Sequence, residues 1–226
     1  MRAADGVVVI GASGFGRESL DVLEALRAHG SGPRLLGVLD DAPSQVNRER
    51  LAARGVPLLG SVSDFLASAE EPVAFVVGIG SPALRRDLAE RMIAAGHRPF
   101  TAVHPSVSLG SQVTLGEGCV LCAGVIVSTN VRLGRQVHLN PGAVIGHDSV
   151  LDDYVSVNPG AIISGEVHLS QGTLVGAGAI VLQQLTVAAN VVVGAGAVVT
   201  KAVPAGVVVK GVPGRWPAQA DEGTHG

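Results

Sequence analysis

Aromatic residues are scarce in this chain, at 3% of 226 residues, although 47% of the residues are hydrophobic. A core of that size has to be built from Val, Leu, Ile and Ala, which suits a narrow prism better than a globular core. Charged residues are also few, at 15%, with a net charge of −3 and no Lys/Arg block. Nucleic acids and anionic membranes are therefore not expected as partners.

Cysteine is nearly absent, and the only two cysteines, Cys119 and Cys122, form a lone C-x-x-C. A redox pair with this spacing should open a helix next to a strand, and a zinc site needs further ligands. We therefore interpret both thiols as packing residues and expect no bound metal.

Long unbroken apolar runs are absent too. The first six residues carry an acid and a glycine where a signal peptide needs a continuous apolar core. The apolar run 191–212 is interrupted by Lys201, Pro204 and Lys210, so it does not predict a membrane span. We therefore expect a cytoplasmic protein.

The chain does contain a six-residue repeat, which runs without a break from residue 103 to residue 204. The first position of every hexad, from Val103 to Val199, is Val, Leu or Ile, and the fifth position holds only small or compact side chains. This period fits short strands that are joined by corners and stacked as a solenoid. If three hexads form one coil, residues eighteen apart lie above one another, and the repeat makes five to six coils.

The first hundred residues instead predict alternating strands and helices. Strands are expected at 7–10, 35–39, 56–59 and 73–77, and helices at 17–29, 48–54, 62–69 and 82–95. A glycine-rich loop joins the first strand to the first helix, an arrangement that presents backbone N–H groups to a phosphate. The loop consists of Gly11, Ala12, Ser13, Gly14, Phe15 and Gly16.

Two acids, Asp40 and Asp41, follow the second strand, where a Rossmann unit places the carboxylate that accepts from a ribose hydroxyl. A second glycine loop covers 78–80. The unit is too short for a complete dinucleotide fold, so we favour a mononucleotide ligand. Alternatively, the glycines only pack a helix tightly against a strand. We expect an α/β Rossmann-like half-domain over 1–100, an all-β parallel β-helix over 101–216 and a disordered tail over 217–226.

The histidines of the hexads do not predict a metal site, because their separations of 34, 9 and 21 residues miss the eighteen-residue coil repeat. His138 and His168 occupy sixth positions, which should point outward into solvent. His147 differs, because it stands at a corner directly before Asp148, an acid that can fix its tautomer.

Gly165 lies eighteen residues after His147 and should place a side-chain-free N–H one coil above it. An imidazole base beside an amide donor is the arrangement that acyl transfer needs. No set of residues for a nucleophilic Ser or Cys is apparent, which favours direct transfer over an acyl-enzyme. A corner histidine that only binds solvent remains the alternative.

These residues resemble a known family. The hexads are similar to those of the left-handed β-helix acyltransferases, and the whole chain resembles their sugar O- and N-acetyltransferase branch, which includes bacillosamine and perosamine N-acetyltransferases and sialic-acid O-acetyltransferases. The left hand of the helix is implied by this resemblance alone. The segments that carry it are 10–16, 39–41, 78–80, 145–148, 163–165, 175–179 and 193–197.

The resemblance implies roles for individual residues. His147 would be the general base with Asp148 as its partner, and Gly165 N–H would bind the thioester carbonyl. Acetyl-CoA would lie along Ala177, Ala195, Lys210 and Pro213. The implied substrate-binding positions are the glycine loop, Asp40, Asp41, Gly80, Arg85, Asn140 and Ser156. A homotrimer with active sites between neighbouring chains is also implied, with no metal.

The chain departs from the family pattern at two positions that bear on the identity of the acceptor. Family members usually carry a histidine where this chain has Phe15, and a second one where it has Ser156. The leading interpretation is acetyl-CoA-dependent N- or O-acyl transfer to a nucleotide-linked amino sugar. Transfer to another small amine or hydroxyl compound, and a non-catalytic trimeric nucleotide-binding scaffold, remain the alternatives.

Overall fold

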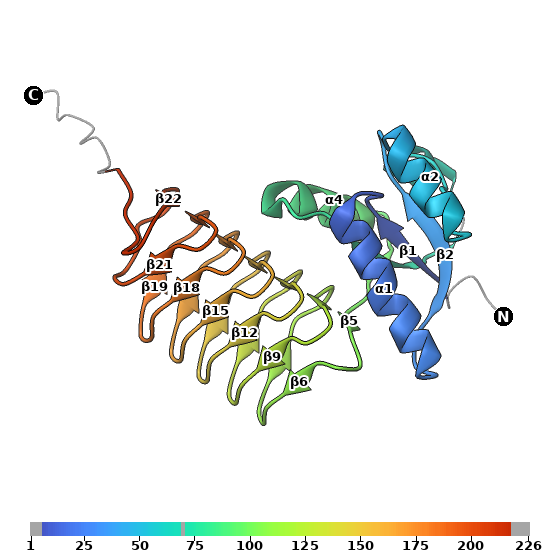
Figure 1. The fold of residues 1–226 in the computed structure, drawn as a ribbon. Coiled ribbons are helices and arrows are strands. Elements are labelled where there is room, and N and C mark those ends of the chain that lie inside the picture. Colours follow the sequence, from blue (N-terminus) through green and yellow to red (C-terminus); the bar gives the residue numbers. More distant parts are fainter. Residues whose placement is uncertain (1–5, 69–70, 218–226) are drawn as a thin grey trace, which may run out of the picture.

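The computed structural model describes residues 6–68 and 71–217. The start of the chain, the expected end of a helix at residue 69 and the expected tail beyond Pro217 lie outside these residues. A small α/β unit sits at one end of a long solenoid, and the chain ends at the other (Figure 1). The expected junction at residues 100 and 101 falls between the last strand of the first sheet and the first strand of the solenoid.

The α/β unit is a four-stranded parallel sheet in the order β2-β1-β3-β4. Its strands are β1 (Gly6–Ile10), β2 (Arg34–Leu39), β3 (Ala74–Val77) and β4 (Arg98–Pro99). Its helices are α1 (Gly14–Ala28), α2 (Gln45–Ala53), α3 (Val62–Ser68) and α4 (Pro82–Ala94). Every residue of β1 is buried, as expected for a central strand that is covered on both faces.

Helix α1 begins at Gly14, three residues earlier than expected, because the second half of the glycine loop forms its first turn. Arg17 N donates to Ser13 O over 3.1 Å. A side chain at Gly16 would collide with the carbonyl oxygen of Gly11, so the loop requires glycine there for close approach.

The prediction of a strand at 56–59 is wrong. This segment pairs with β2 only through the bridge between Val38 and Leu58. Pro57 lacks an N–H donor, which limits any longer ladder at this edge of the sheet.

The solenoid has a two-residue strand in nearly every hexad, arranged in three parallel sheets with about six turns. Residues eighteen apart pair directly, as in Arg132 with Val150, which confirms the predicted stacking. The strands of the first sheet are β5 (Ala102–Val103), β8 (Val120–Leu121), β11 (His138–Leu139), β14 (Ser156–Val157), β17 (Leu174–Val175), β20 (Val192–Val193) and β22 (Val208–Val209).

The two other sheets complete the triangular cross-section. The second consists of β6 (Ser108–Leu109), β9 (Ile126–Val127), β12 (Val144–Ile145), β15 (Ile162–Ile163), β18 (Ile180–Val181) and β21 (Val198–Val199). The third consists of β7 (Thr114–Leu115), β10 (Arg132–Leu133), β13 (Val150–Leu151), β16 (His168–Leu169) and β19 (Thr186–Val187). We name them the first, second and third faces.

The two ends of the solenoid differ. In the first coil Leu109 is 44% exposed, because no coil lies beneath it. At the far end β22 joins the first face with a spacing of sixteen residues, Val192 to Val208, so the repeat loses its register as predicted yet still adds a strand. Trp216 then packs against the end of the aliphatic core.

The first face is covered by the α/β unit over its early coils. Ala102, Val120 and Cys122 belong to the same buried cluster as residues of β1 and α1. Cys119 lies in the solenoid core, and both thiols are free and buried, which agrees with the packing interpretation. Burial raises the pKa of each thiol to about 12.

Candidate active site

The candidate base, His147, stands at the corner that joins the second face to the third. Its Nδ1 lies 2.7 Å from Asp148 Oδ2. A carboxylate can only accept a hydrogen bond, so Nδ1 carries the proton and Nε2 presents its lone pair to solvent. The Asp148 backbone is in the left-handed region, with φ of 59°, and this turns the carboxylate back toward the imidazole.

A second residue, Asn130, holds the same carboxylate from the coil below. Its Nδ2 donates to Asp148 Oδ1 over 2.9 Å. The hydrogen bonds from His147 and then from Asn130 lower the pKa of Asp148, so the acid stays ionised beside the imidazole. The sequence analysis missed Asn130, although its position eighteen residues before Asp148 was the signal that could have revealed it.

Gly165 lies directly above the imidazole, as predicted. A Cβ placed on Gly165 would collide with His147 Nε2 and would lie 2.6 Å from Cε1, so only glycine leaves room for the ring. Among the described residues, no group accepts a hydrogen bond from Gly165 N–H. The corner therefore holds a free N–H donor and an acid-paired imidazole within one coil step.

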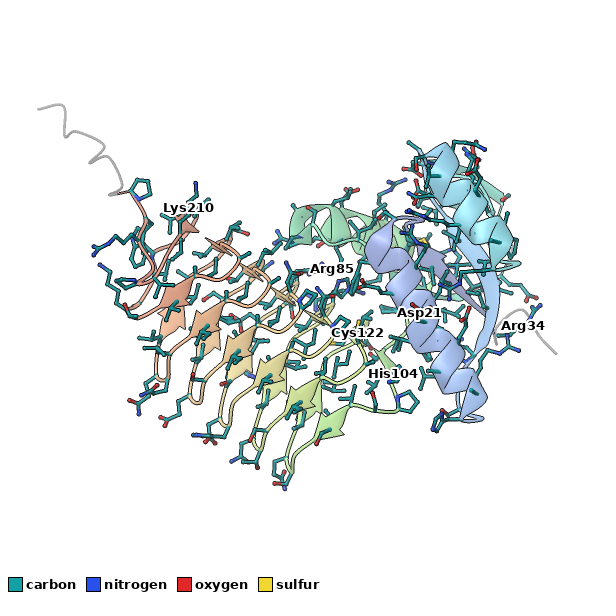
Figure 2. All side chains as sticks on the ribbon, in the orientation of Figure 1. Asp21, Arg34, Arg85, His104, Cys122 and Lys210 are labelled. Carbon is teal, nitrogen blue, oxygen red and sulfur yellow. The ribbon has the colours of Figure 1, made fainter. Side chains whose placement is uncertain are left out.

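The expected acetyl-CoA positions lie on another edge of the prism. Ala177 and Ala195 are exposed at the corner between the first and second faces, one above the other. Lys210 is at the far end of the solenoid (Figure 2), where it lines a pocket of about 340 Å³ with Val208, Arg215, Trp216 and Pro217. Pro213 is exposed close by in the chain.

Trp216 adds an aromatic surface to this pocket. Lys201 Nζ lies 4.9 Å from the centre of the indole ring, and Lys210 and Arg215 are paired through their backbones. The sequence analysis did not single out Trp216 or Arg215, because a lone aromatic beyond the repeat carries no periodic signal.

In the α/β unit the predicted acids bind the backbone. Asp40 accepts from Ala12 N over 2.7 Å and from Ala42 N over 2.9 Å, and Asp41 accepts from Val62 N over 2.8 Å. Asp40 Oδ2 thus holds the glycine loop at Ala12, while Asp40 Oδ1 holds the turn that follows β2 at Ala42. Asp41 Oδ2 has no hydrogen-bond partner among the described residues.

These acids border a pocket of about 250 Å³ at the carboxyl ends of the strands, where ligands bind in open α/β sheets. Its walls are mostly aliphatic, and its lining consists of Ile10, Gly11, Asp40, Asp41, Ala42, Val62, Ile79, Leu84, Leu88 and Arg91. Asp40, Asp41 and Arg91 add charged groups to this aliphatic lining.

Arg85 joins the α/β unit to the solenoid (Figure 2). It is fully buried and donates to Ile79 O over 2.9 Å, to Tyr154 O over 2.6 Å and to Ser156 Oγ over 2.9 Å. Burial lowers the pKa of its guanidinium to about 9. The side chains of Arg85 and Ser156 thus bind each other, and a longer contact of 3.4 Å reaches Gly80 O.

Asn140 is buried on the coil above Cys122. Its Nδ2 donates to Asn158 Oδ1 over 2.8 Å, whereas its Oδ1 has no partner among the described residues. The structure therefore separates the predicted site residues into two groups. His147, Asp148 and Gly165 lie at the corner between the second and third faces. Asn140 lies at the corner between the first and second faces together with Ala177 and Ala195, which we name the alanine edge, and Ser156 lies on the first face against Arg85 of the α/β unit.

The expectation that His138 faces solvent is wrong. The α/β unit covers this part of the first face, and His138 is 1% exposed against the ring of Phe15. Burial, and then the charge of Arg85, hold the pKa of His138 well below its usual value. His168 is partly exposed and lies 2.8 Å from Asp152.

Stability should fall as the pH is lowered below about 6.5. In the folded state, burial holds the pKa of both His138 and His97 below that value, whereas the unfolded chain takes up the protons. Each histidine therefore contributes stability above pH 6.5 that is lost at up to about 1.4 kcal/mol per pH unit below it. Denaturant unfolding at pH 7.5 and pH 5.5 measures the loss.

The matched variants are His138→Phe, which should flatten this pH dependence, and His29→Gln, which should not, because His29 is exposed. An equal slope in both variants would contradict the assignment to His138.

Comparison with known proteins identifies the family of this chain. The family model described as the PglD N-terminal domain matches residues 6–92. A perosamine N-acetyltransferase variant from Caulobacter crescentus, solved with CoA and GDP-perosamine, is 31% identical with a TM-score of 0.84, and the match covers 95% of this chain and 97% of that one. The chain belongs to the hexapeptide-repeat acyltransferases of the sugar O- and N-acetyltransferase branch. As a member it is an acetyltransferase, and its solenoid is a left-handed parallel β-helix.

Two further solved structures match over nearly the whole chain. The acetyltransferase domain of PglB from Neisseria gonorrhoeae FA1090 is 30% identical, with 94% of this chain and 100% of that chain covered and a TM-score of 0.83. WeeI from Acinetobacter baumannii AYE is 29% identical, with 93% and 99% covered and a TM-score of 0.81. A search of curated proteins gave no significant match.

Two absences hold for the described residues of this acetyltransferase. Across 6–68 and 71–217, no helix is long and apolar enough to cross a membrane. Within the same ranges, no group of three or more His, Cys, Asp or Glu side chains is arranged to hold a metal ion.

Proposed function

We propose that this acetyltransferase moves an acetyl group from acetyl-CoA directly to an amine or hydroxyl of a nucleotide-linked amino sugar, with His147 as general base. The observation that carries the proposal is the corner at His147. There an acid-paired imidazole offers its Nε2 beside the N–H of Gly165, and neither has a hydrogen-bond partner within 6–68 and 71–217.

The proposed reaction uses these groups in one sequence. His147 Nε2 removes the proton from the acceptor nitrogen or oxygen as that atom attacks the thioester carbonyl. Gly165 N–H donates to the oxyanion of the tetrahedral intermediate. The C–S bond then breaks, and the imidazolium returns its proton to the leaving thiolate of CoA. Asp148, held by Asn130, stabilises the imidazolium between the two proton transfers.

The proposed acetyl-CoA site runs along the alanine edge of the solenoid. Small side chains at Ala177 and Ala195 allow the pantetheine arm to approach the backbone there. Lys210, Arg215 and Lys201 supply positive charge for the phosphates at the far end, and Trp216 offers a surface for the adenine. The perosamine and PglB relatives were solved with CoA and acetyl-CoA, which supports the same co-substrate here.

The proposed site for the acceptor's nucleotide is the aliphatic pocket of the α/β unit, with the diphosphate at the glycine loop. The perosamine relative binds GDP-perosamine, which supports this class of acceptor. Phe15 and Ser156 supply no imidazole at the two positions named above, and this favours another small amine or hydroxyl acceptor as the second candidate. Dependence on acetyl-CoA favours a cytoplasmic location.

The separation of the two groups of residues supports the proposed homotrimer. His147 and the alanine edge lie on opposite borders of the second face of the same chain. The outward residues of that face form an aliphatic ladder suited to a second copy: Ile126, Val144, Ile162, Ile180 and Val198. Packing it against another solenoid would bring one chain's His147 toward the other chain's alanine edge.

The change Ile162→Glu should therefore break the assembly. Ile162 is 40% exposed at the middle of the ladder, and a buried, unpaired carboxylate there would oppose association. Light scattering at micromolar concentration should show a trimer for the wild type and monomers for the variant, with loss of acetyl transfer. The control Thr186→Glu on the third face should remain trimeric. A monomeric wild type would contradict both the trimer and the shared site.

Nucleotide binding should depend on Asp41. Asp41→Asn keeps an oxygen for Val62 N–H but removes the charge, so binding of a nucleotide sugar should weaken by about 1–3 kcal/mol. Calorimetry with UDP-, GDP-, CMP- and dTDP-sugars measures this, and acetyl-CoA affinity should stay constant. Glu49→Gln, on the exposed side of α2, is the control. Equal nucleotide affinity in both variants would remove Asp41 from the site.

The function itself is tested by thiol release from acetyl-CoA with the same panel of nucleotide sugars and with simple amines. Turnover with one nucleotide amino sugar is expected. Turnover only with simple amines would show that the acceptor is a small amine and not a nucleotide-linked amino sugar. No turnover with any acceptor would overturn the proposal.

A further inference from the structure

One buried side chain has no role in the chemistry described so far. His138 lies on β11 beneath the α/β unit, and neither ring nitrogen has a hydrogen-bond partner among the described residues. Leaving a buried polar group unpaired costs about 1–3 kcal/mol, and such groups are rare in folded proteins. A phenylalanine would fill the same space without this penalty, so packing alone does not explain the imidazole.

The surroundings of His138 keep the ring uncharged. Ser156, its direct neighbour on β14, already binds Arg85. Because the burial of His138 and the charge of Arg85 both disfavour the imidazolium, the ring stays neutral near pH 7. A neutral imidazole offers one donor and one acceptor, which matches a hydroxyl group.

The Phe15 ring packs against the His138 imidazole and covers it. The two ring centres are 4.5 Å apart, with 33° between the ring planes. Phe15 is the second residue of α1, in the glycine loop, and is itself partly exposed. It stands between two glycines, and a Cβ on Gly14 would meet no atom within 4 Å, so the space beside the loop is open. A diphosphate bound at this loop would lie next to the cover.

We propose that His138 is a specificity-determining residue for the acceptor and that Phe15 covers it until the acceptor binds. The nucleotide sugar's diphosphate occupies the glycine loop, the Phe15 ring moves off His138, and the exposed imidazole then hydrogen-bonds a sugar hydroxyl. This inference rests on the proposed function, because it assumes a nucleotide-linked sugar as acceptor.

The change His138→Phe separates a recognition role from a structural one. The acceptor KM should rise at least about 10-fold, as expected for the loss of a hydrogen bond of about 1.4 kcal/mol, while the KM for acetyl-CoA stays unchanged. The Tm should stay equal or rise, because two unpaired nitrogens are replaced by apolar atoms. An acceptor KM within two-fold of the wild-type value would overturn the proposal.

A second measurement does not depend on catalysis or on the folding of that variant. The full-length protein is labelled, and its imidazole NMR signals are followed from pH 7.5 to pH 5.5 with and without UDP or GDP. The His138 signal should not titrate in the free wild type, should titrate in Phe15→Ala, and should shift when a nucleotide binds. A His138 signal that is unchanged by both nucleotides and by Phe15→Ala overturns the proposal.

These outcomes separate the inference from the proposed function. Acetyl transfer without any response of His138 leaves the function standing and removes the inference. If nucleotides shift the His138 NMR signal but the protein acetylates no acceptor, the result supports a nucleotide-linked site at His138 and overturns the proposed acetyl transfer.

Discussion

Replacing His147 by alanine is expected to lower kcat by about 10²- to 10⁴-fold, the usual contribution of a positioned general base. The imidazole is the base in the proposed reaction, and its Nδ1 is already committed to Asp148 at 2.7 Å. The affinity for acetyl-CoA should change little, because the proposed contacts to its pantetheine arm and nucleotide run along the alanine edge and the far end of the solenoid and do not include the His147 side chain. Steady-state kinetics together with calorimetry of acetyl-CoA binding measure both quantities.

The chain offers a matched control in His168. This histidine also pairs with an acid, Asp152, at 2.8 Å, and is also partly exposed on the solenoid, but it lies on the third face. His168→Ala should retain wild-type kcat. A His147→Ala variant within a few-fold of wild type would remove His147 from the mechanism, and an equal loss in both variants would indicate a general effect on the solenoid.

Gly165→Ala is expected to reduce kcat by about 10²-fold or more while the solenoid stays folded. The added methyl group would meet the His147 ring, with Cε1 at 2.6 Å in the present geometry, so the exposed imidazole has to move. A displaced base and a covered N–H donor would both weaken the transition state, and a single oxyanion donor alone contributes about 10²- to 10³-fold. The kcat with saturating substrates measures the loss.

The control for this variant is Gln183→Ala, one coil above Gly165 on the same edge, where the side chain is exposed. It should leave kcat and Tm unchanged. A Gly165→Ala protein with wild-type kcat would show that neither the position of the imidazole nor access to the Gly165 N–H matters. A large drop in its Tm would assign the loss to folding instead.

The geometry of the candidate corner at His147 was predictable because it depends on spacing alone. Once three hexads form a coil, Gly165 has to lie one step above His147, and the structure places it there. The same rule reaches Asn130, eighteen residues before Asp148, but an amide at an exposed corner carries no chemical signal by itself. Its hydrogen bond to the carboxylate became visible only with the coordinates.

The interface between the two units was not predictable. A sixth position points outward in an isolated prism, and this rule placed His138 in solvent. It fails on the first face, where the α/β unit packs over the early coils and buries His138 and Ser156. Arg85 shows the same limit, because its partners Tyr154 and Ser156 are about seventy residues away and share no periodic relation with it.

By itself, the sequence determined the features that repeat or lie close together in the chain: the aliphatic column, the eighteen-residue stacking, the glycine loop and the acid beside His147. Local geometry and a strict period are enough to specify these, because each coil contacts only its neighbours. The tertiary structure decided which outward face becomes buried, that Asp40 holds the glycine loop, and that Phe15 covers a neutral His138. Those contacts join segments that are distant in sequence, so they depend on how two separately patterned units pack together, which no period in either unit encodes.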